Sequence, residues 1–145
     1  GSEDGVSKGA GVVTGQGAVG VIDAVSRNFS YARSFKNHEM NISARLGEEG
    51  AVGPMSWDGL SSDGAILREI PLHVEFEKGD TVYTSGYSSI FPPDIPLGTT
   101  GEAKIVNGAT YDIEISLFED FGALRYVTIV ENIGEEEIKK LEEGL

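Results

Sequence analysis

The sequence contains no cysteine, only two histidines, and 11 lysine and arginine residues against 24 aspartate and glutamate residues. Without cysteine the chain has no disulfide bridge, no thiolate zinc site and no cysteine nucleophile. The formal net charge of −13 at pH 7 argues against nucleic acid and anionic lipid as partners, because both are bound mainly through lysine and arginine. No apolar run approaches the roughly 20 residues of a membrane-spanning helix. A chain of 145 residues can fold as one ordinary or two very small domains without metal or cofactor.

The sequence is rich in short runs of β-branched and aromatic residues, which are separated by 20 glycines. This pattern is typical of brief strands joined by tight turns, and it predicts an all-β fold. Two segments alternate with the period of a half-buried strand. Their apolar positions are Met40, Ile42, Ala44 and Leu46 in the first, and Tyr111, Ile113, Ile115 and Leu117 in the second. Residues 124–130 have the composition of a more fully buried strand.

Local signals also mark one hairpin and one helix. Asn107-Gly108 lies between two strand-like runs, where two residues with positive φ would close a hairpin. Residues 133–145 are acidic and rich in helix formers, with glutamate and lysine at i,i+4 spacing. A helix of two to three turns is marginal alone, so this segment is expected to be a short helical or disordered tail.

An internal repeat suggests how the chain is divided. Residues 8–14 and 78–84 share the pattern K-G-x-x-V-x-T, separated by nearly half the chain. Each Lys-Gly predicts a turn with a glycine at positive φ, followed by an extended segment. Small β modules avoid exposed edges best by closing into barrels. We therefore expect two five- or six-stranded β-barrels, at residues 1–70 and 71–132, a division that allows strands to be exchanged between them.

The most distinctive stretch is residues 78–98, which read K-G-D-T-V-Y-T-S-G-Y-S-S-I-F-P-P-D-I-P-L-G. In order and spacing it resembles the MreC family, in which K-G-D is followed by V-x-T-S-G, a phenylalanine-proline turn and I/L-P-V/L-G. The residues that carry this resemblance are Lys78, Gly79, Asp80, Thr84, Ser85, Gly86, Pro96 and Gly98, with further agreement at Lys8, Gly9 and Gly20. Residues 41–44 and 57–59 are similar to the version found in the Bacteroidetes. Asp94 replaces a glycine of many members, and aspartate tolerates a left-handed backbone better than most residues.

The resemblance implies a fold, a location and a function. The fold is two small β-barrels in a chymotrypsin-like double arrangement, preceded by a membrane helix and a dimerising coiled coil upstream of residue 1. The location is the periplasm, with an anchor in the inner membrane. The function is a non-catalytic scaffold of the cell-wall elongation machinery that maintains cell shape. Such a scaffold binds a class B penicillin-binding transpeptidase, self-associates as a dimer or filament, and connects to MreD and MreB through its membrane part.

Enzymatic and ligand-binding alternatives rest on few residues. A serine hydrolase would use Ser85 with His38 or His73 and an acid such as Asp80, although no G-x-S-x-G surrounds the serine. The two histidines lack the spacing of a zinc site. Residues 15–20 satisfy G-x-G-x-x-G, but a strand is predicted to follow, so we interpret them as a glycine-rich β-turn. A barrel that binds a small ligand or glycan would need a concave apolar pocket.

Aromatic and proline residues supply the candidates for protein binding. A stiff apolar loop loses little entropy on association, and the predicted contact surface is Tyr87, Ile90, Phe91, Pro92, Pro93 and Asp94. The alternative is that Phe91 and Ile95 plug the second barrel and leave Tyr87 alone exposed. Core packing in the first barrel is the expectation for Phe29, Tyr31 and Phe35, and a core or barrel-cap position is the expectation for Trp57.

Overall fold

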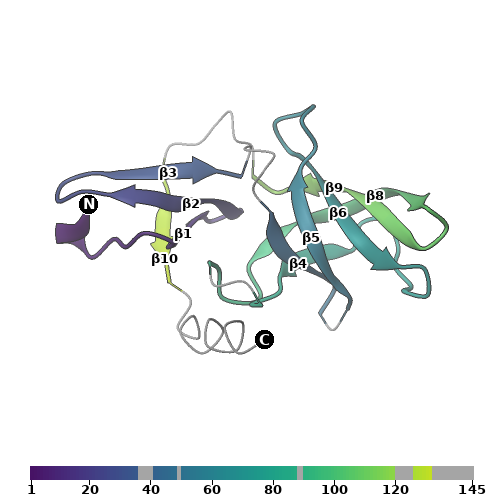
Figure 1. The fold of residues 1–145 in the computed structure, drawn as a ribbon. Helices are drawn as coiled ribbons and strands as arrows, with labels where there is room; N and C mark the ends of the chain where they lie inside the picture. Colours follow the sequence, from purple (N-terminus) through teal and green to yellow (C-terminus); the bar gives the residue numbers. More distant parts are fainter. Residues whose placement is uncertain (36–40, 49, 88–89, 120–125, 132–145) are drawn as a thin grey trace.

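The protein is described by a computed structural model that covers residues 1–35, 41–48, 50–87, 90–119 and 126–131. In these residues the chain forms a short 3-10 helix and ten strands, arranged as a closed barrel and an open sheet (Figure 1). In chain order the elements are η1 (Ser2–Asp4), β1 (Gly11–Thr14), β2 (Gly17–Val25), β3 (Ser30–Ser34), β4 (Ile42–Leu46), β5 (Val52–Trp57), β6 (Gly64–Pro71), β7 (Thr81–Thr84), β8 (Pro96–Val106), β9 (Thr110–Leu117) and β10 (Thr128–Val130). The all-β prediction is confirmed for this part of the chain.

The closed barrel has the strand order β4-β5-β6-β9-β8-β7, and its neighbouring strands pair antiparallel. The predicted alternation in β4 is confirmed, because Ile42, Ala44 and Leu46 are buried while Ser43 and Arg45 are half-buried. The same period holds in β9, where the buried residues are Ile113, Ile115 and Leu117. These side chains fill the barrel, because residues two apart in a strand project to the same face.

The second β unit is an open sheet with the order β10-β1-β2-β3, which corrects the expectation of a second closed barrel. Residues 1–35 and 126–131 supply only these four strands, and within the described structure β3 and β10 are its edges. The barrel takes β4, β5 and β6 from the first half of the chain and β7, β8 and β9 from the second. The expected boundary at residues 70 and 71 falls at the end of β6, inside the barrel. The tail at 133–145 lies outside the described residues.

The internal repeat is visible in the backbone. Gly9 and Gly79 have φ values of 88° and 89°, which confirms the predicted glycine turns. The N–H of Gly9 donates to the carbonyl of Ile22 at 2.7 Å, and the N–H of Gly79 donates to the carbonyl of Thr100 at 2.9 Å. The pairing of the following strand then shifts register at matching places, between Val12 and Val13 and between Val82 and Tyr83, with the extra residue on the partner strand. The two halves of the chain therefore share a turn, a strand and a register shift, although each of them contributes three strands to the same closed barrel.

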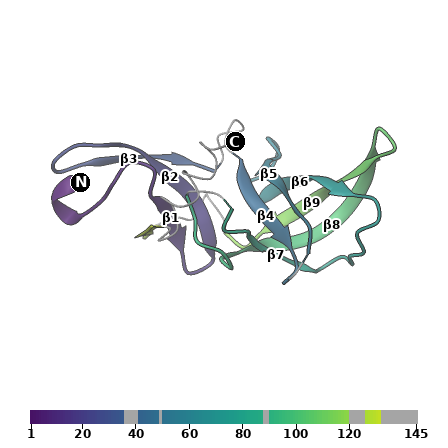
Figure 2. The ribbon, with the colours of Figure 1, turned by 60° about the horizontal axis from the view of Figure 1, so that its bottom comes forward.

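The hairpin between β8 and β9 has the predicted turn. Asn107 and Gly108 have φ values of 53° and 66°, and the N–H of Ala109 donates to the carbonyl of Val106 at 3.1 Å. This is the geometry of a primed turn, whose twist matches that of the paired strands. The hairpin projects at the end of the molecule away from the N-terminus (Figure 2).

The segment that leads into β10 is more exposed than predicted. Residues 124 and 125 lie outside the described structure, whereas Tyr126 and Val127 are exposed and β10 itself spans only Thr128–Val130. β10 pairs with β1 alone, at the edge of the open sheet. An edge strand is covered by fewer neighbours than a central strand. An apolar composition therefore does not mean that the strand is fully buried.

One hydrophobic core joins the sheet to the barrel. Val21 of β2 and Phe35, just after β3, are buried in the same cluster as Leu67 of β6. Phe91, from the loop between β7 and β8, belongs to this cluster and lies against Gly11 of β1. A smaller cluster on the sheet consists of Ala10, Val12, Val19 and Ile22. Sheet and barrel thus form one packed body, with the residue 84–96 loop at their junction.

Candidate interaction surface

Thr84 organises the loop that the sequence singles out. Its side chain is buried at the end of β7, where Oγ1 donates to the carbonyl of Pro92 at 2.7 Å and accepts from the N–H of Ile95 at 2.9 Å. Its main chain is bonded as well, because its N–H donates to Ile95 and its carbonyl accepts from Asp94. A buried hydroxyl with both a donor and an acceptor partner is satisfied and directional. One side chain therefore ties the two ends of the loop together.

Ser85 and Gly86 continue this arrangement and present Tyr87. The N–H of Ser85 donates to the carbonyl of Ser43 at 3.0 Å, and the two serine hydroxyls lie 2.7 Å apart. The hydroxyl of Ser85 also accepts from the N–H of Tyr87 at 3.1 Å. Gly86 has a φ of 80°, and a Cβ there would come within 2.7 Å of Pro93. Tyr87 projects from this hydrogen-bonded backbone, and 71% of the surface of the residue is exposed.

Phe91 lies inside the protein and not on its surface. It is 1% exposed and packs in the shared core of sheet and barrel, with the half-buried Ile90 beside it. Of the six predicted contact residues, Tyr87, Pro93 and Asp94 are exposed. The structure therefore corrects the expectation that the Phe91 ring offers a contact. Of the alternative only the burial of Phe91 is found, because Ile95 is half-buried and Tyr87 is exposed together with Pro93 and Asp94. The buried ring anchors the loop beneath its exposed residues.

Asp94 has the left-handed backbone that the sequence comparison suggested. Its φ is 71°, in the region that glycine adopts most easily. Its carboxylate pairs with Arg45 of β4, with Oδ1 and Nη2 separated by 2.7 Å. The same guanidinium donates to the carbonyl of Gly47 and lies 5.2 Å from the ring centre of Tyr83. Sequence reasoning missed Arg45, because nothing in the local pattern of β4 indicates a partner almost fifty residues away.

The K-G-D residues at the other end of β7 make a structural turn. The carboxylate of Asp80 accepts from the N–H of Glu77, three residues earlier, at 2.9 Å, and the N–H of Asp80 donates to the carbonyl of Glu77 at 3.3 Å. Thr100 of β8 closes the turn, because its Oγ1 donates to the carbonyl of Glu77 and accepts from the N–H of Asp80. Lys78 forms an exposed ion pair with Glu102. The motif residues therefore fix where β7 begins and how it pairs with β8.

The serine and the aspartate considered as catalytic candidates take part in structural hydrogen bonds. Ser85 bonds to Ser43 and to the backbone of Tyr87, while Asp80 caps its own turn. His73 follows β6 in a turn, and His38 lies outside the described residues. Residues 15 and 16 of the G-x-G-x-x-G stretch form the turn between β1 and β2, and residues 17–20 already belong to β2, so the predicted turn followed by a strand is found. Across the described ranges we find no cluster of three or more potential metal ligands, and no helix there is long and apolar enough to cross a membrane.

The other aromatic residues divide in a way that the sequence did not show. Phe35 is fully buried, as expected, but Phe29 and Tyr31 are 77% and 67% exposed, which corrects the prediction that they pack in a core. Phe29 directly precedes β3 and Tyr31 lies in it, and β3 pairs with β2 alone and so buries little of its surface. Trp57 is half-buried, and its Nε1–H donates to the carbonyl of Ser61 at 2.6 Å.

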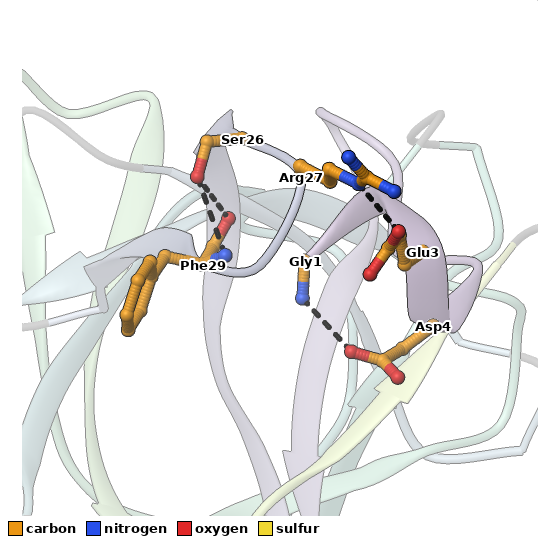
Figure 3. Close-up of polar contacts among 6 residues, drawn as sticks. All are labelled: Gly1, Glu3, Asp4, Ser26, Arg27 and Phe29. Carbon is orange, nitrogen blue, oxygen red and sulfur yellow. Dashed lines mark hydrogen bonds and ion pairs between the residues drawn. The ribbon is translucent and has the colours of Figure 1, made fainter.

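The tip of the β2–β3 hairpin is braced by the N-terminal residues. The N–H groups of Ser2 and Glu3 donate to the carbonyls of Ser26 and Arg27, and the side chains of Glu3 and Arg27 form an ion pair. The hydroxyl of Ser26 bonds to the backbone of Phe29, which closes the turn (Figure 3). Figure 3 shows the ring of Phe29 directed away from the N-terminal turn. The hairpin thus carries an exposed aromatic ring on a well-tethered backbone.

A closed antiparallel barrel packed on an open sheet, with its motif residues engaged in turns, defines this protein as an all-β barrel-core module. The sequence matches the family described as "Rod shape-determining protein MreC, barrel core" over residues 1–131. The chain belongs to the MreC family.

Individual relatives agree with this assignment. The cell shape-determining protein MreC of Listeria monocytogenes is 28% identical over an alignment of 141 residues, which covers 93% of this chain and 47% of the relative. The chain thus spans about half the length of the curated relative that it matches. The crystal structure of MreC from Pseudomonas aeruginosa superposes with a TM-score of 0.80 at 21% identity, covering 90% of this chain and 84% of that one. MreC in a complex with penicillin-binding protein PBP2, from Helicobacter pylori, gives a TM-score of 0.69 at 18% identity, covering 85% and 77%. These structures show the fold.

Proposed function

We propose that this chain is the extracytoplasmic part of a scaffold of the cell-wall elongation machinery, and that it binds a class B penicillin-binding transpeptidase. The observation that carries the proposal is membership of the MreC family, together with the Helicobacter pylori relative of the same fold in complex with PBP2. The scaffold performs no chemical step; it positions the enzyme and thereby maintains cell shape. The proposal includes self-association, links to MreD and MreB through a membrane part, and a periplasmic location with an inner-membrane anchor.

The exposed half of the loop at 84–96 is the contact surface that we propose. Tyr87 offers a large amphipathic ring, and Pro93 and Asp94 lie exposed beside the same turn. Tyrosine is among the residues that contribute most to protein interfaces, and a preorganised loop loses little entropy when it binds. The hydrogen bonds from Thr84, at the start of the loop, to Pro92 and Ile95 near its end support this preorganisation.

The buried half of the loop has a supporting role. Phe91 anchors the loop in the core, and Ile90 and Pro92 are half-buried next to it. The ion pair between Arg45 and Asp94 holds the far end of the turn against β4. These residues act on binding through the position of Tyr87 and its exposed neighbours.

The test is binding to the purified extracytoplasmic domain of the elongation transpeptidase from the same organism. We expect saturable binding by calorimetry that Tyr87→Ala weakens about tenfold, equivalent to about 1.4 kcal/mol. The matched control is Leu60→Ala, because Leu60 is 89% exposed on the turn after β5 and should leave the affinity unchanged. Equal losses in both variants would remove the loop as the contact surface. No binding by the unmodified chain up to about 100 μM would contradict the proposed partner.

A further inference from the structure

β3 is a strand at the edge of the sheet, and it carries the exposed aromatic residue Tyr31. It is the last strand of the sheet order β10-β1-β2-β3, and its first three residues, Ser30 to Ala32, are all exposed. Natural edge strands are commonly protected by lysine, proline or a bulge on the edge itself. β3 has neither lysine nor proline, and its one charged side chain, Arg33, is half-buried. The irregularity of the β2–β3 pair lies on β2, between Ile22 and Ala24. No described strand pairs with the outer edge of β3, and Val127 lines one cavity with Ala32, Arg33 and Ser34 in its second half.

The charge of the protein is unevenly distributed between its two parts. The described residues of the barrel segment, 41–119, carry 12 acidic and four basic side chains. The described residues of the sheet, 1–35 and 126–131, carry four acidic and three basic side chains. Two copies of this chain that met through their barrels would repel each other, whereas the sheet ends are nearly neutral. Electrostatics therefore favours the sheet as the surface on which two copies can meet.

The direction of β3 strengthens this argument. The strand runs from the hairpin tip at Ser30 toward Phe35, whose side chain is in the core shared with the barrel (Figure 1). If two β3 strands pair antiparallel, each barrel lies beyond the opposite end of the joint strand pair. The two strongly negative parts are then separated as far as this edge allows, and the pairing forms one continuous sheet from both copies.

From these observations we propose that β3 pairs antiparallel with β3 of a second copy, in a two-fold arrangement centred on Ala32. This inference rests on the proposed scaffold function and names the surface of its self-association. In this register Tyr31 of each copy lies opposite Arg33 of the other, so an aromatic ring faces a guanidinium twice across the axis. Within the described residues Arg33 has no ion-pair partner. A contact between two five-residue strands is small, so the dimer is weak and has a Kd between about 1 μM and 1 mM.

Sedimentation velocity of the 145-residue chain, from about 10 μM to 1 mM, tests whether two copies associate through β3. Tyr31→Lys places a lysine opposite Arg33 and is expected to raise the dimer Kd at least tenfold, because like charges directly opposite destabilise a strand pair. Leu60→Lys adds the same charge at an equally exposed barrel residue and is the matched control. Since both copies are negative overall, association should strengthen as salt is raised from about 50 mM to 500 mM. A chain that stays monomeric to 1 mM, or equal effects of both variants, overturns the proposal.

Cross-linking tests the register separately. The chain has no cysteine, so a single introduced cysteine reports unambiguously. Ala32→Cys places two thiols across the two-fold axis, at a Cβ separation of about 4.5–5.5 Å, and should form a covalent dimer under mild oxidation. Ile105→Cys, on the exposed β8–β9 hairpin, is the control and should remain largely monomeric. Equal cross-linking at both positions contradicts the register and the surface.

Failure of the β3 dimer can be distinguished from failure of the scaffold function. If Tyr31→Lys abolishes self-association and leaves transpeptidase binding intact, the two surfaces are separate, as proposed here. If the chain never self-associates and Tyr31→Lys abolishes transpeptidase binding, β3 belongs to the interface with the enzyme. That result would overturn the dimer and leave the scaffold function standing.

Discussion

The contact between Gly11 and Phe91 offers the sharpest test of how the sheet and the barrel are joined. Gly11 lies in β1, and a Cβ at this position would come within 2.7 Å of two ring carbons of Phe91 and 3.1 Å of the carbonyl oxygen of Ile90. The backbone of Gly11 is not in the left-handed region, so alanine is conformationally allowed there. Any destabilisation by Gly11→Ala must therefore arise from crowding against the ring.

The magnitude follows from the burial of the ring. Phe91 is almost completely buried between sheet and barrel, so it cannot move aside into solvent. Overpacking of this kind costs about 1–3 kcal/mol. Replacing glycine by alanine also restricts the unfolded chain, which offsets about 0.4–1 kcal/mol of that cost. We expect Gly11→Ala to lower the free energy of unfolding by about 0.5–2 kcal/mol.

A double-mutant cycle isolates the contact. Phe91→Leu alone should cost about 1–2 kcal/mol because it leaves unfilled volume. In the double variant the smaller side chain makes room for the added methyl group, so the combined cost should fall at least about 0.5 kcal/mol below the sum. Urea unfolding monitored by circular dichroism measures all four free energies.

Gly15→Ala is the matched control for this cycle, since it makes the same change in the turn after β1, where an added Cβ meets nothing within 4 Å. It should change stability by no more than about 0.5–1 kcal/mol, in the stabilising direction if at all. Additive costs in the double variant, or a Gly15→Ala effect as large as that of Gly11→Ala, would refute the packing of Phe91 on β1.

Three further substitutions test the strain and bonding of the loops. Thr84→Val keeps the shape of the side chain but leaves the carbonyl of Pro92 and the N–H of Ile95 without their partner, so thermal unfolding should show a loss of about 1–3 kcal/mol. Glu69→Gly removes an exposed side chain from a residue with a φ of 62°, so it should raise the free energy of unfolding by up to about 1 kcal/mol. Asp94→Gly relieves a smaller strain at a φ of 71°, because aspartate tolerates this region better than glutamate, and it also loses an ion pair. Its gain should therefore be the smaller of the two, and the reverse order would contradict this reasoning.

The site was only partly predictable, for a reason that particular residues illustrate. The sequence correctly marked the segment between Thr84 and Pro96 as unusual, because its prolines and glycines restrict the backbone locally. It did not show that Phe91 points inward and Tyr87 outward, since that depends on where β1 lies against the loop. Arg45 was missed for the same reason: its partner Asp94 is distant in the chain.

The aromatic residues near β3 show the limit of composition as a guide to burial. Tyr31 and Phe35 both suit a packed strand, but Phe35 is buried and Tyr31 is exposed. The difference arises because β3 is an edge strand, which has a neighbouring strand on one side only. A pattern of period 2 within one strand cannot carry that information.

By itself the sequence determined local features of this protein: the alternation of β4 and β9, the glycine turns at Gly9 and Gly79, the Asn107-Gly108 hairpin, and the repeat that relates its two halves. These depend on side-chain alternation and on the φ that each residue tolerates, which neighbouring residues specify. Only the tertiary structure decided that β4 to β9 close one barrel across the middle of the chain and leave β1, β2, β3 and β10 as an open sheet. Barrel closure depends on pairing between strands far apart in the chain, such as β4 with β7, and the residues of either strand alone do not encode it.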